Sequence, residues 1–205
     1  MAVSKLRPTK RASAAIAAVM AMAFSIGGAW FVSVPSVKPG ATEAAQVYPA
    51  AVVLAAEYIV KDWEGLRLTS YRDMVGVWTV CYGETLGVRA GMRKTKAECE
   101  AMLYERLYRD FYLAIVKCAP ELAAAPVSVQ AAMLSGSFNF GVGAFCRSPS
   151  LMGPIRSKAW RPACDALTLF VRAGGRVVQG LVNRRGMGDP TRIGEGELCV
   201  TGLPK

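Results

Sequence analysis

The segment Trp63–Thr85, WEGLRLTSYRDMVGVWTVCYGET, contains the pattern from which the fold of this chain can be predicted. A helical apolar pattern runs up to it, and Gly65 is a residue that commonly ends a helix. The stretch 66–73 then alternates as a strand does, 74–77 can turn the chain, and 78–83 can return as the partner strand. The segment therefore predicts a helix end followed by a β-hairpin.

Two acids and one hydroxyl in this segment are candidates for chemistry: Glu64, Asp73 and Thr79. Along an unbroken helix, nine residues would turn the two carboxylates to roughly opposite faces. A helix that stops at Gly65 and a hairpin that folds back can instead bring both acids to one cleft. A carboxylic acid, a carboxylate and a hydroxyl that holds a water form a plausible glycosidase site. The spacing alone fits equally well an ordinary hairpin with charges on its outer face.

The wider string resembles the active-site signature of the phage T4-type lysozymes, glycoside hydrolase family 24, in their lambdoid and P22-like branch. Similar segments follow in the family's order over about residues 50–205, namely KTKAECEAML, QAAMLSGSFNFGVGAFCRS, ACDALTLFVRAGG, GLVNRR and ELC. The resemblance implies that Glu64 protonates the glycosidic oxygen and that Asp73 and Thr79 handle the attacking water. It also implies that Arg184 lies beside the catalytic glutamate.

The fold that the resemblance implies is α+β and mostly helical, with the lysozyme-like arrangement of two lobes. A small lobe bears the β-hairpin, a long helix connects it to a larger helical lobe, and the cleft lies between them. The residues fit this independently, because Thr95 and Glu98 form a T-x-x-E capping box that opens a helix through about Lys117. Pro126 precedes a second helical run, and Asn139, near the end of that run, supports the fold rather than the chemistry.

The N-terminal region predicts one transmembrane helix ahead of this domain. Residues 12–37 carry no charge, and a helix of that length can cross a ~30 Å hydrocarbon core. The basic residues before it predict a cytoplasmic N-terminus. The span is rich in Ala, Ser and Gly, so its hold on the bilayer is weak. Three alternatives remain open: an ordinary anchor, a signal peptide removed near ATEAA, and a weak anchor that can leave the membrane, with an uncleaved span favoured.

The expected organisation has four parts. Residues 1–11 form a basic cytoplasmic N-terminus, 12–37 a weakly hydrophobic signal-anchor, 38–49 a Pro-punctuated linker, and 50–205 the lysozyme-like domain.

The six cysteines predict disulfides rather than a metal site. They are even in number and widely spread, and the chain has no C-x-x-C pair and no histidine to complete a zinc site, so no metal and no cofactor is expected. A membrane-targeting start favours an oxidising compartment. We expect Cys81 to pair with Cys99, which would tie the returning strand to the start of the long helix. The pairing of the others stays open: Cys118, Cys146, Cys164 and Cys199.

The net charge of +10 suits an anionic partner such as nucleic acid, a membrane surface or a cell-wall polymer. The chain has no basic patch interleaved with aromatics and no nucleic-acid motif, so no nucleic acid is expected as a partner. The expected partners are peptidoglycan and, through the N-terminal helix, the inner membrane. A monomer is expected.

Two features depart from the family pattern. Glu84 stands where the family usually has histidine, and if Asp110 is its neighbour, like charges replace an ion pair. The stretch between Arg185 and Cys199 is longer than usual, and we interpret the insert as a Gly-rich surface loop.

The resemblance implies a muramidase that cleaves the β-1,4 bond between N-acetylmuramic acid and N-acetylglucosamine in peptidoglycan and so lyses the host as a phage endolysin. The weak anchor resembles the signal-anchor-release type, held in the host inner membrane with its catalytic domain in the periplasm and releasable from there. Two alternatives are a membrane-tethered, non-catalytic peptidoglycan-binding protein and a host wall-remodelling muramidase.

Overall fold

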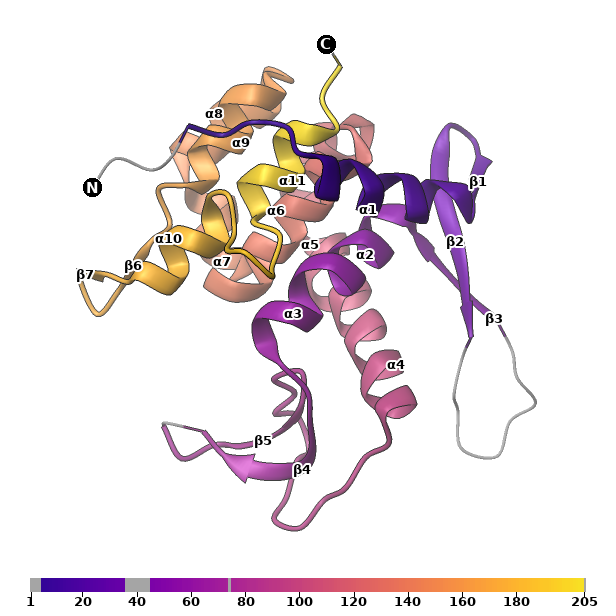
Figure 1. The fold of residues 1–205 in the computed structure, drawn as a ribbon, viewed down its shortest axis with the longest axis vertical. Helices are drawn as coiled ribbons and strands as arrows, with labels where there is room; N and C mark the ends of the chain where they lie inside the picture. The colour runs from indigo at the N-terminus through magenta and orange to yellow at the C-terminus, as the bar shows by residue number, and fades with distance from the viewer. Residues whose placement is uncertain (1–4, 36–44, 74, 205) are drawn as a thin grey trace.

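A large helical lobe and a small β-hairpin lobe are joined by a long helical segment (Figure 1). The structure, a computed structural model, describes residues 5–35, 45–73 and 75–204. The predicted two-lobe architecture is present. The N-terminal helix and a three-stranded sheet lie against the large lobe on the side away from the β-hairpin's tip.

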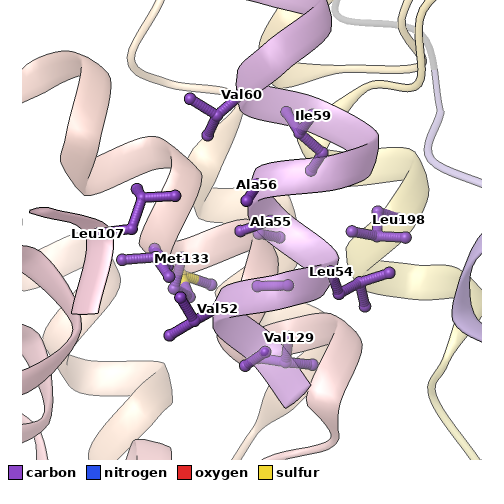
Figure 2. Close-up of a cluster of buried hydrophobic side chains, with 14 of the residues drawn as sticks. Val52, Leu54, Ala55, Ala56, Ile59, Val60, Leu107, Val129, Met133 and Leu198 are labelled. Carbon is purple, nitrogen blue, oxygen red and sulfur yellow. The ribbon is translucent and has the colours of Figure 1, made fainter. Parts of the chain in front are cut away.

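The central helical segment runs from Ala50 to Glu64. It consists of α2 (Ala50–Ala55), the π-helical turn η1 (Ala56–Val60) and α3 (Lys61–Glu64). All of Ala50–Ala56 is buried, and a helix that is apolar on every side belongs inside a core. Figure 2 shows its side chains packed against the helices that surround it. Gly65, with a φ of +72°, ends the segment as predicted, so Glu64 is its last residue and lies where the segment leaves the core.

The small lobe contains the predicted hairpin. Strands β4 (Arg67–Arg72) and β5 (Trp78–Cys81) pair antiparallel, and Tyr71 lies opposite Thr79. The predicted capping box of Thr95 is also present, and it opens α4 (Lys96–Arg106). The helix continues as the π-turn η2 (Leu107–Tyr112) and as α5 (Leu113–Cys118), which agrees with the predicted end near Lys117.

The large lobe surrounds α6 (Val127–Phe140), in which every residue from Ser128 to Ser137 is buried. This is the helix predicted after Pro126. The other elements of the lobe are η3 (Pro120–Ala124), α7 (Val142–Arg147), α8 (Pro149–Arg156), α9 (Trp160–Leu167), the strand pair β6 (Arg172–Ala173) and β7 (Arg176–Val177), α10 (Gln179–Arg185) and α11 (Glu195–Thr201).

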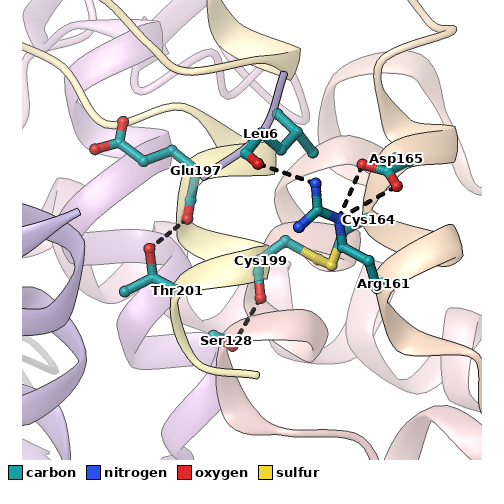
Figure 3. Close-up of a disulfide and its surroundings, with 8 residues drawn as sticks. All are labelled: Leu6, Ser128, Arg161, Cys164, Asp165, Glu197, Cys199 and Thr201. Carbon is teal, nitrogen blue, oxygen red and sulfur yellow. Dashed lines mark hydrogen bonds and ion pairs between the residues drawn. A yellow bond between two sulfur atoms is a disulfide. The ribbon is translucent and has the colours of Figure 1, made fainter. Parts of the chain in front are cut away.

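All six cysteines are paired. The expected bond between Cys81 and Cys99 joins β5 to α4. The two bonds that the sequence left open are Cys118–Cys146, from α5 to α7, and Cys164–Cys199, from α9 to α11. Figure 3 shows that two hydrogen bonds lie near this last disulfide. Ser128 donates a hydrogen bond to the carbonyl of Cys199, and Arg161 donates one to the carbonyl of Leu6.

The segment expected to form one membrane-spanning helix is divided in this structure. It forms α1 (Lys10–Ala21), β1 (Ala23–Ile26) and β2 (Ala29–Pro35), and its last two residues lie outside the described part. Within the described ranges, no helix combines the length and the apolar character needed to cross a bilayer.

Local chemistry explains the division. Gly27 and Gly28 have φ values of +59° and +81°, which suits a two-residue hairpin turn, and the aromatic and β-branched residues that follow favour a strand. Of the expected linker, 38–44 lies outside the described residues, and β3 (Ala45–Pro49) pairs with β2.

Helix α1 packs its small side chains onto the large lobe. Ala12, Ala15 and Val19 are buried, at the spacing of one helical face, and α1 lies beside α2 and α11. Thr9 caps the helix by accepting a hydrogen bond from the backbone N–H of Ala12. Helix α1 thereby lies beside the C-terminal helix α11, as Figure 1 shows.

We predict that removing the Cys164–Cys199 bond destabilises the fold strongly. The two cysteines are 35 residues apart, and the loop-entropy model assigns a bond of that span about 4 kcal/mol. Urea unfolding of the Cys164→Ser/Cys199→Ser protein should show this loss, and mass spectrometry of a non-reduced digest should find the three pairs. An unchanged unfolding midpoint, or six free thiols in the exported protein, would contradict the prediction.

Candidate active site

Glu64 lines a cavity of about 510 Å³. The cavity is lined by the residues that leave α3 and enter β4: Glu64, Gly65, Leu66, Arg67, Leu68 and Thr69. The Glu64 side chain is 24% exposed, and its Oε1 accepts a hydrogen bond of 2.7 Å from Nη1 of Arg184. The ion pair expected of these two residues is therefore present.

Arg184 is a buried cation shared by two carboxylates. Besides its contact with Glu64, its Nε donates to Oε1 of Glu195 over 3.1 Å, and its side chain is only 5% exposed. Burial would lower the pKa of Arg184, but the two carboxylates outweigh burial and the pKa is raised. Arg184 therefore stays charged and holds Glu64 at a fixed place.

Glu195 completes this cluster from the first turn of α11. Its side chain is fully buried, and it accepts hydrogen bonds from Ser135, Arg184 and Arg185. Burial, together with repulsion from Arg184, lowers the pKa of Arg185 despite its pairing with Glu195. Two arginines and two carboxylates thus form an electrically balanced group. Glu195 and Arg185 could not be predicted as site residues from the sequence, because no local pattern links an acid to arginines on the other side of a loop.

Asn139 has the structural role that was predicted for it. Its side-chain oxygen accepts a hydrogen bond from Arg185, whose guanidinium also lies 5.1 Å from the centroid of the Phe140 ring. These contacts hold the end of α6 against α10. The site cluster is thereby tied to the core of the large lobe.

Asp73 and Thr79 lie together at the turn end of the hairpin. Oδ1 of Asp73 accepts hydrogen bonds from the backbone N–H groups of Val75 and Val77, at 3.0 and 2.8 Å. The hydroxyl of Thr79, which is nearly buried, donates to the carbonyl of Val77 over 3.1 Å. Both side chains therefore contact the backbone of Val77, near the turn of the hairpin. Between described residues, no hydrogen bond or ion pair joins Glu64 to either of them.

Like charges would meet here if Asp110 were the neighbour of Glu84. Glu84 instead pairs with Arg106, the last residue of α4, and also accepts hydrogen bonds of 2.7 Å from the backbone N–H groups of Thr85 and Leu86. Asp110 lies about one helical turn further on and is exposed. Glu84 therefore replaces the family's histidine without leaving an uncompensated charge, because Arg106 on the long helix neutralises it.

The insert between Arg185 and Cys199 is not simply the surface loop that was predicted. Gly194 is buried, and its backbone touches that of Gly186 and Gly188. The carbonyl of Ile193 accepts a hydrogen bond of 2.8 Å from the indole N–H of Trp63. The insert therefore reaches the residue that precedes Glu64.

Comparison with known proteins identifies relatives over most of the chain. A family model described as phage lysozyme matches residues 61–187. The chain is 34% identical over 141 residues to a SAR-endolysin of Enterobacteria phage P21, and 35% identical over 143 residues to a SAR-endolysin of Enterobacteria phage PA-2. Each match covers 68% of this chain and 78% of the relative. The active form of the P1 phage endolysin aligns with a TM-score of 0.62 and 26% identity, covering 75% of this chain and 85% of that one.

We predict that Glu84 and Arg106 stabilise the small lobe as a pair. Replacing either one, as Glu84→Gln or Arg106→Met, leaves a largely buried charge without its partner and should cost about 1–3 kcal/mol of unfolding free energy. The double variant should cost less than the two single changes together. Urea unfolding of the four proteins measures the coupling. Strictly additive losses would mean that the two residues stabilise the fold independently.

Proposed function

The chain belongs to the phage lysozyme family, and from that premise we propose that Glu64 is the general acid of a muramidase. The protein is an endolysin that hydrolyses peptidoglycan. We assign the cleavage to the β-1,4 bond between N-acetylmuramic acid and N-acetylglucosamine. The observation that carries the assignment of Glu64 is its place at the exposed end of a buried helix, ion-paired with a buried arginine in front of an open cavity.

The geometry supports a division of labour between the two oxygens of Glu64. Arg184 engages Oε1, and we assign the proton for the leaving glycosidic oxygen to Oε2. A general acid must lie within hydrogen-bond reach of the oxygen that it protonates, and Glu64 lies at the end of α3 beside the cavity. Arg184 keeps the side chain at one place.

Asp73 and Thr79 are assigned to the attacking water. Their contacts with the backbone of Val77 place both on the hairpin, apart from the Glu64–Arg184 pair. A water that attacks the anomeric carbon directly inverts its configuration, and inverting glycosidases separate their two carboxyl groups by roughly 6.5–9.5 Å. That separation leaves room for the water between Asp73 and the sugar ring.

We further propose that the protein waits in the host inner membrane and is released from it. Two relatives carry the name SAR-endolysin. The uncharged span 12–37 is long enough to insert but contains many small residues that add little hydrophobic free energy. The inward-negative potential holds the basic N-terminal end in the cytoplasm, at ~2.3 kcal/mol per charge per 100 mV. Loss of the potential removes that term, and the anchor leaves the membrane, so that the uncut protein is released into the periplasm.

The contacts of Arg11 fit the released form. Its guanidinium donates two hydrogen bonds of 2.7 Å to the carboxylate of Glu197, and Thr9 also donates to that carboxylate. Burial would raise the pKa of Glu197, but these bonds outweigh burial and lower it. An Arg11 on the cytoplasmic side of a membrane could not reach a carboxylate of the periplasmic domain. We therefore assign the structure to the protein after release.

We predict that Glu64→Gln abolishes lysis while leaving the fold intact. Glutamine keeps the shape of the side chain but has no proton to give the leaving oxygen, so the rate should fall by about 10²–10⁴-fold. Dye release from purified labelled peptidoglycan measures the rate. Glu105→Gln, at a 40% exposed acid on the long helix, is the matched control and should act as the unchanged protein does. Near-normal lysis by Glu64→Gln would refute the assignment.

We predict that Ala17→Leu/Ala21→Leu locks the protein in the membrane. Both alanines are exposed in the structure, so leucine there leaves the released fold undisturbed while adding about 2 kcal/mol of hydrophobic free energy per site. Gly27 and Gly28 are left unchanged because their positive φ disfavours leucine.

Fractionation of cells treated with an ionophore provides the test. The original protein should move uncut to the periplasm, the leucine variant should stay in the membrane and delay lysis, and Ala17→Ser/Ala21→Ser should be released. Cleavage near residues 41–45, or an original protein that stays bound after depolarisation, would contradict release.

A further inference from the structure

Trp63, the residue before the assigned catalytic acid, is held by the loop that joins α10 to α11. Its indole N–H donates a hydrogen bond of 2.8 Å to the carbonyl of Ile193. The guanidinium of Arg192 lies 3.9 Å from the centroid of its ring, within the range of a cation–π contact. Trp63 is thus fixed both at its polar edge and across its face.

Arg192 is itself held in the orientation that covers the ring. Its Nε and Nη2 donate to Oδ2 of Asp189 at 2.7 and 2.6 Å. The other oxygen of Asp189 accepts from the backbone N–H groups of Thr191 and Arg192. These bonds, led by that from the Arg192 side chain, hold the pKa of Asp189 well below its usual range. Asp189 therefore keeps its charge, and with it the ion pair to Arg192, below the pH at which an ordinary aspartate is protonated.

Within the loop, residues 186–194, backbone atoms of different residues lie in close contact. Gly188 has a φ of +74°, and a Cβ there would lie 2.1 Å from the carbonyl oxygen of Arg192. A Cβ on Gly194 would lie 2.3 Å from the carbonyl oxygen of Gly186. Asp189 and Arg192 close the loop with a backbone hydrogen bond of 3.0 Å. Only glycine allows these backbone contacts, so the loop is compact and packs against itself.

The ends of the loop give it a direct relation to the acid. It begins after α10, which carries Arg184, and ends at α11, which carries Glu195. One continuous piece of chain therefore supplies the cation that binds Glu64, the carboxylate that binds the cation, and the clamp on Trp63.

We propose that the loop 186–194 positions the catalytic acid, with Trp63 and Arg192 as positioning residues. The inference rests on the proposed role of Glu64. Helix α3 is a single turn that is followed at once by Gly65, whose backbone is in a conformation that few residues adopt. As the last turn of the segment Ala50–Glu64, α3 has no buried residue, so the core holds it less firmly than it holds α2. The clamp on Trp63 and the ion pair with Arg184 fix it at two points, and so define where Glu64 meets the glycosidic oxygen.

A purely structural role for Trp63 makes a different prediction. If the contact with Arg192 only contributes packing, its loss lowers the unfolding temperature and leaves the turnover of folded protein unchanged. If it positions Glu64, its loss lowers kcat with little change in KM, because a misplacement of about 1 Å at a reacting group can cost up to 10²-fold in rate.

Steady-state kinetics on soluble, uncross-linked glycan strands of peptidoglycan separate the two roles. The variants are Arg192→Ala, Arg192→Lys and Trp63→Phe, the last of which keeps a ring and loses the indole N–H. Arg109→Ala, at a 68% exposed arginine paired within its own helix, is the matched control. Rates are divided by the folded fraction from circular dichroism, at a temperature well below unfolding.

We expect kcat to fall about tenfold in Arg192→Ala and in Trp63→Phe, with KM within twofold of the original and Arg109→Ala unaffected. Arg192→Lys should recover part of the loss, because lysine restores charge but not the planar stacking. Values of kcat within twofold of the control, or losses that vanish after correction for folded protein, would overturn the inference while Glu64→Gln still identifies the acid. An original protein without turnover, or an active Glu64→Gln, would overturn the proposed function and this inference with it.

Discussion

The buried carboxylate of Glu195 is the constraint on which the active site depends. A charge that is removed from water costs several kcal/mol unless it is paired and hydrogen-bonded, and the same holds for the adjacent cations of Arg184 and Arg185. Each of these groups is tolerable only because the others are present. The arrangement leaves one part of Arg184 directed at Glu64. The position of a residue on the central helix is thereby set by the C-terminal helix, across more than one hundred residues of sequence.

The same C-terminal helix also binds residues at the start of α1. Glu197, two residues after Glu195, binds Thr9 and Arg11, while Arg11 also donates to the carbonyls of Met187 and Asp189 in the loop that clamps Trp63. Residues 9–11, at the start of α1, therefore lie next to α11 and the loop that hold the acid. In the release that we propose, arrival of the N-terminus adds contacts to this loop. Exit from the membrane and formation of the contacts between Arg11 and the loop would then occur together.

Features encoded by neighbouring residues could be predicted from the sequence. Gly65 ends the helix, and Thr95 and Glu98 form the capping box. Cys81 is bonded to Cys99. All three features depend on residues of one short region of the chain. The pairing of Arg184 with Glu64 came from family resemblance. Partners that meet only in the folded chain were missed or misassigned: Glu195 lies across a loop from its arginines, and Glu84 meets a residue one helical turn from the expected one. The division of the N-terminal span was missed because an apolar, Ala-rich stretch suits a bilayer and a protein surface alike.

Glu195→Gln tests most directly whether the buried cluster places the catalytic acid. Glutamine matches the shape of glutamate but leaves two buried arginines with one carboxylate between them, that of Glu64. The measurement is dye release from labelled peptidoglycan per molecule of folded protein, with the folded fraction taken from circular dichroism. The account predicts a loss of at least about tenfold in rate, since Arg184 would no longer be held where it meets Glu64. A Glu195→Gln protein that lyses peptidoglycan at the original rate would contradict it.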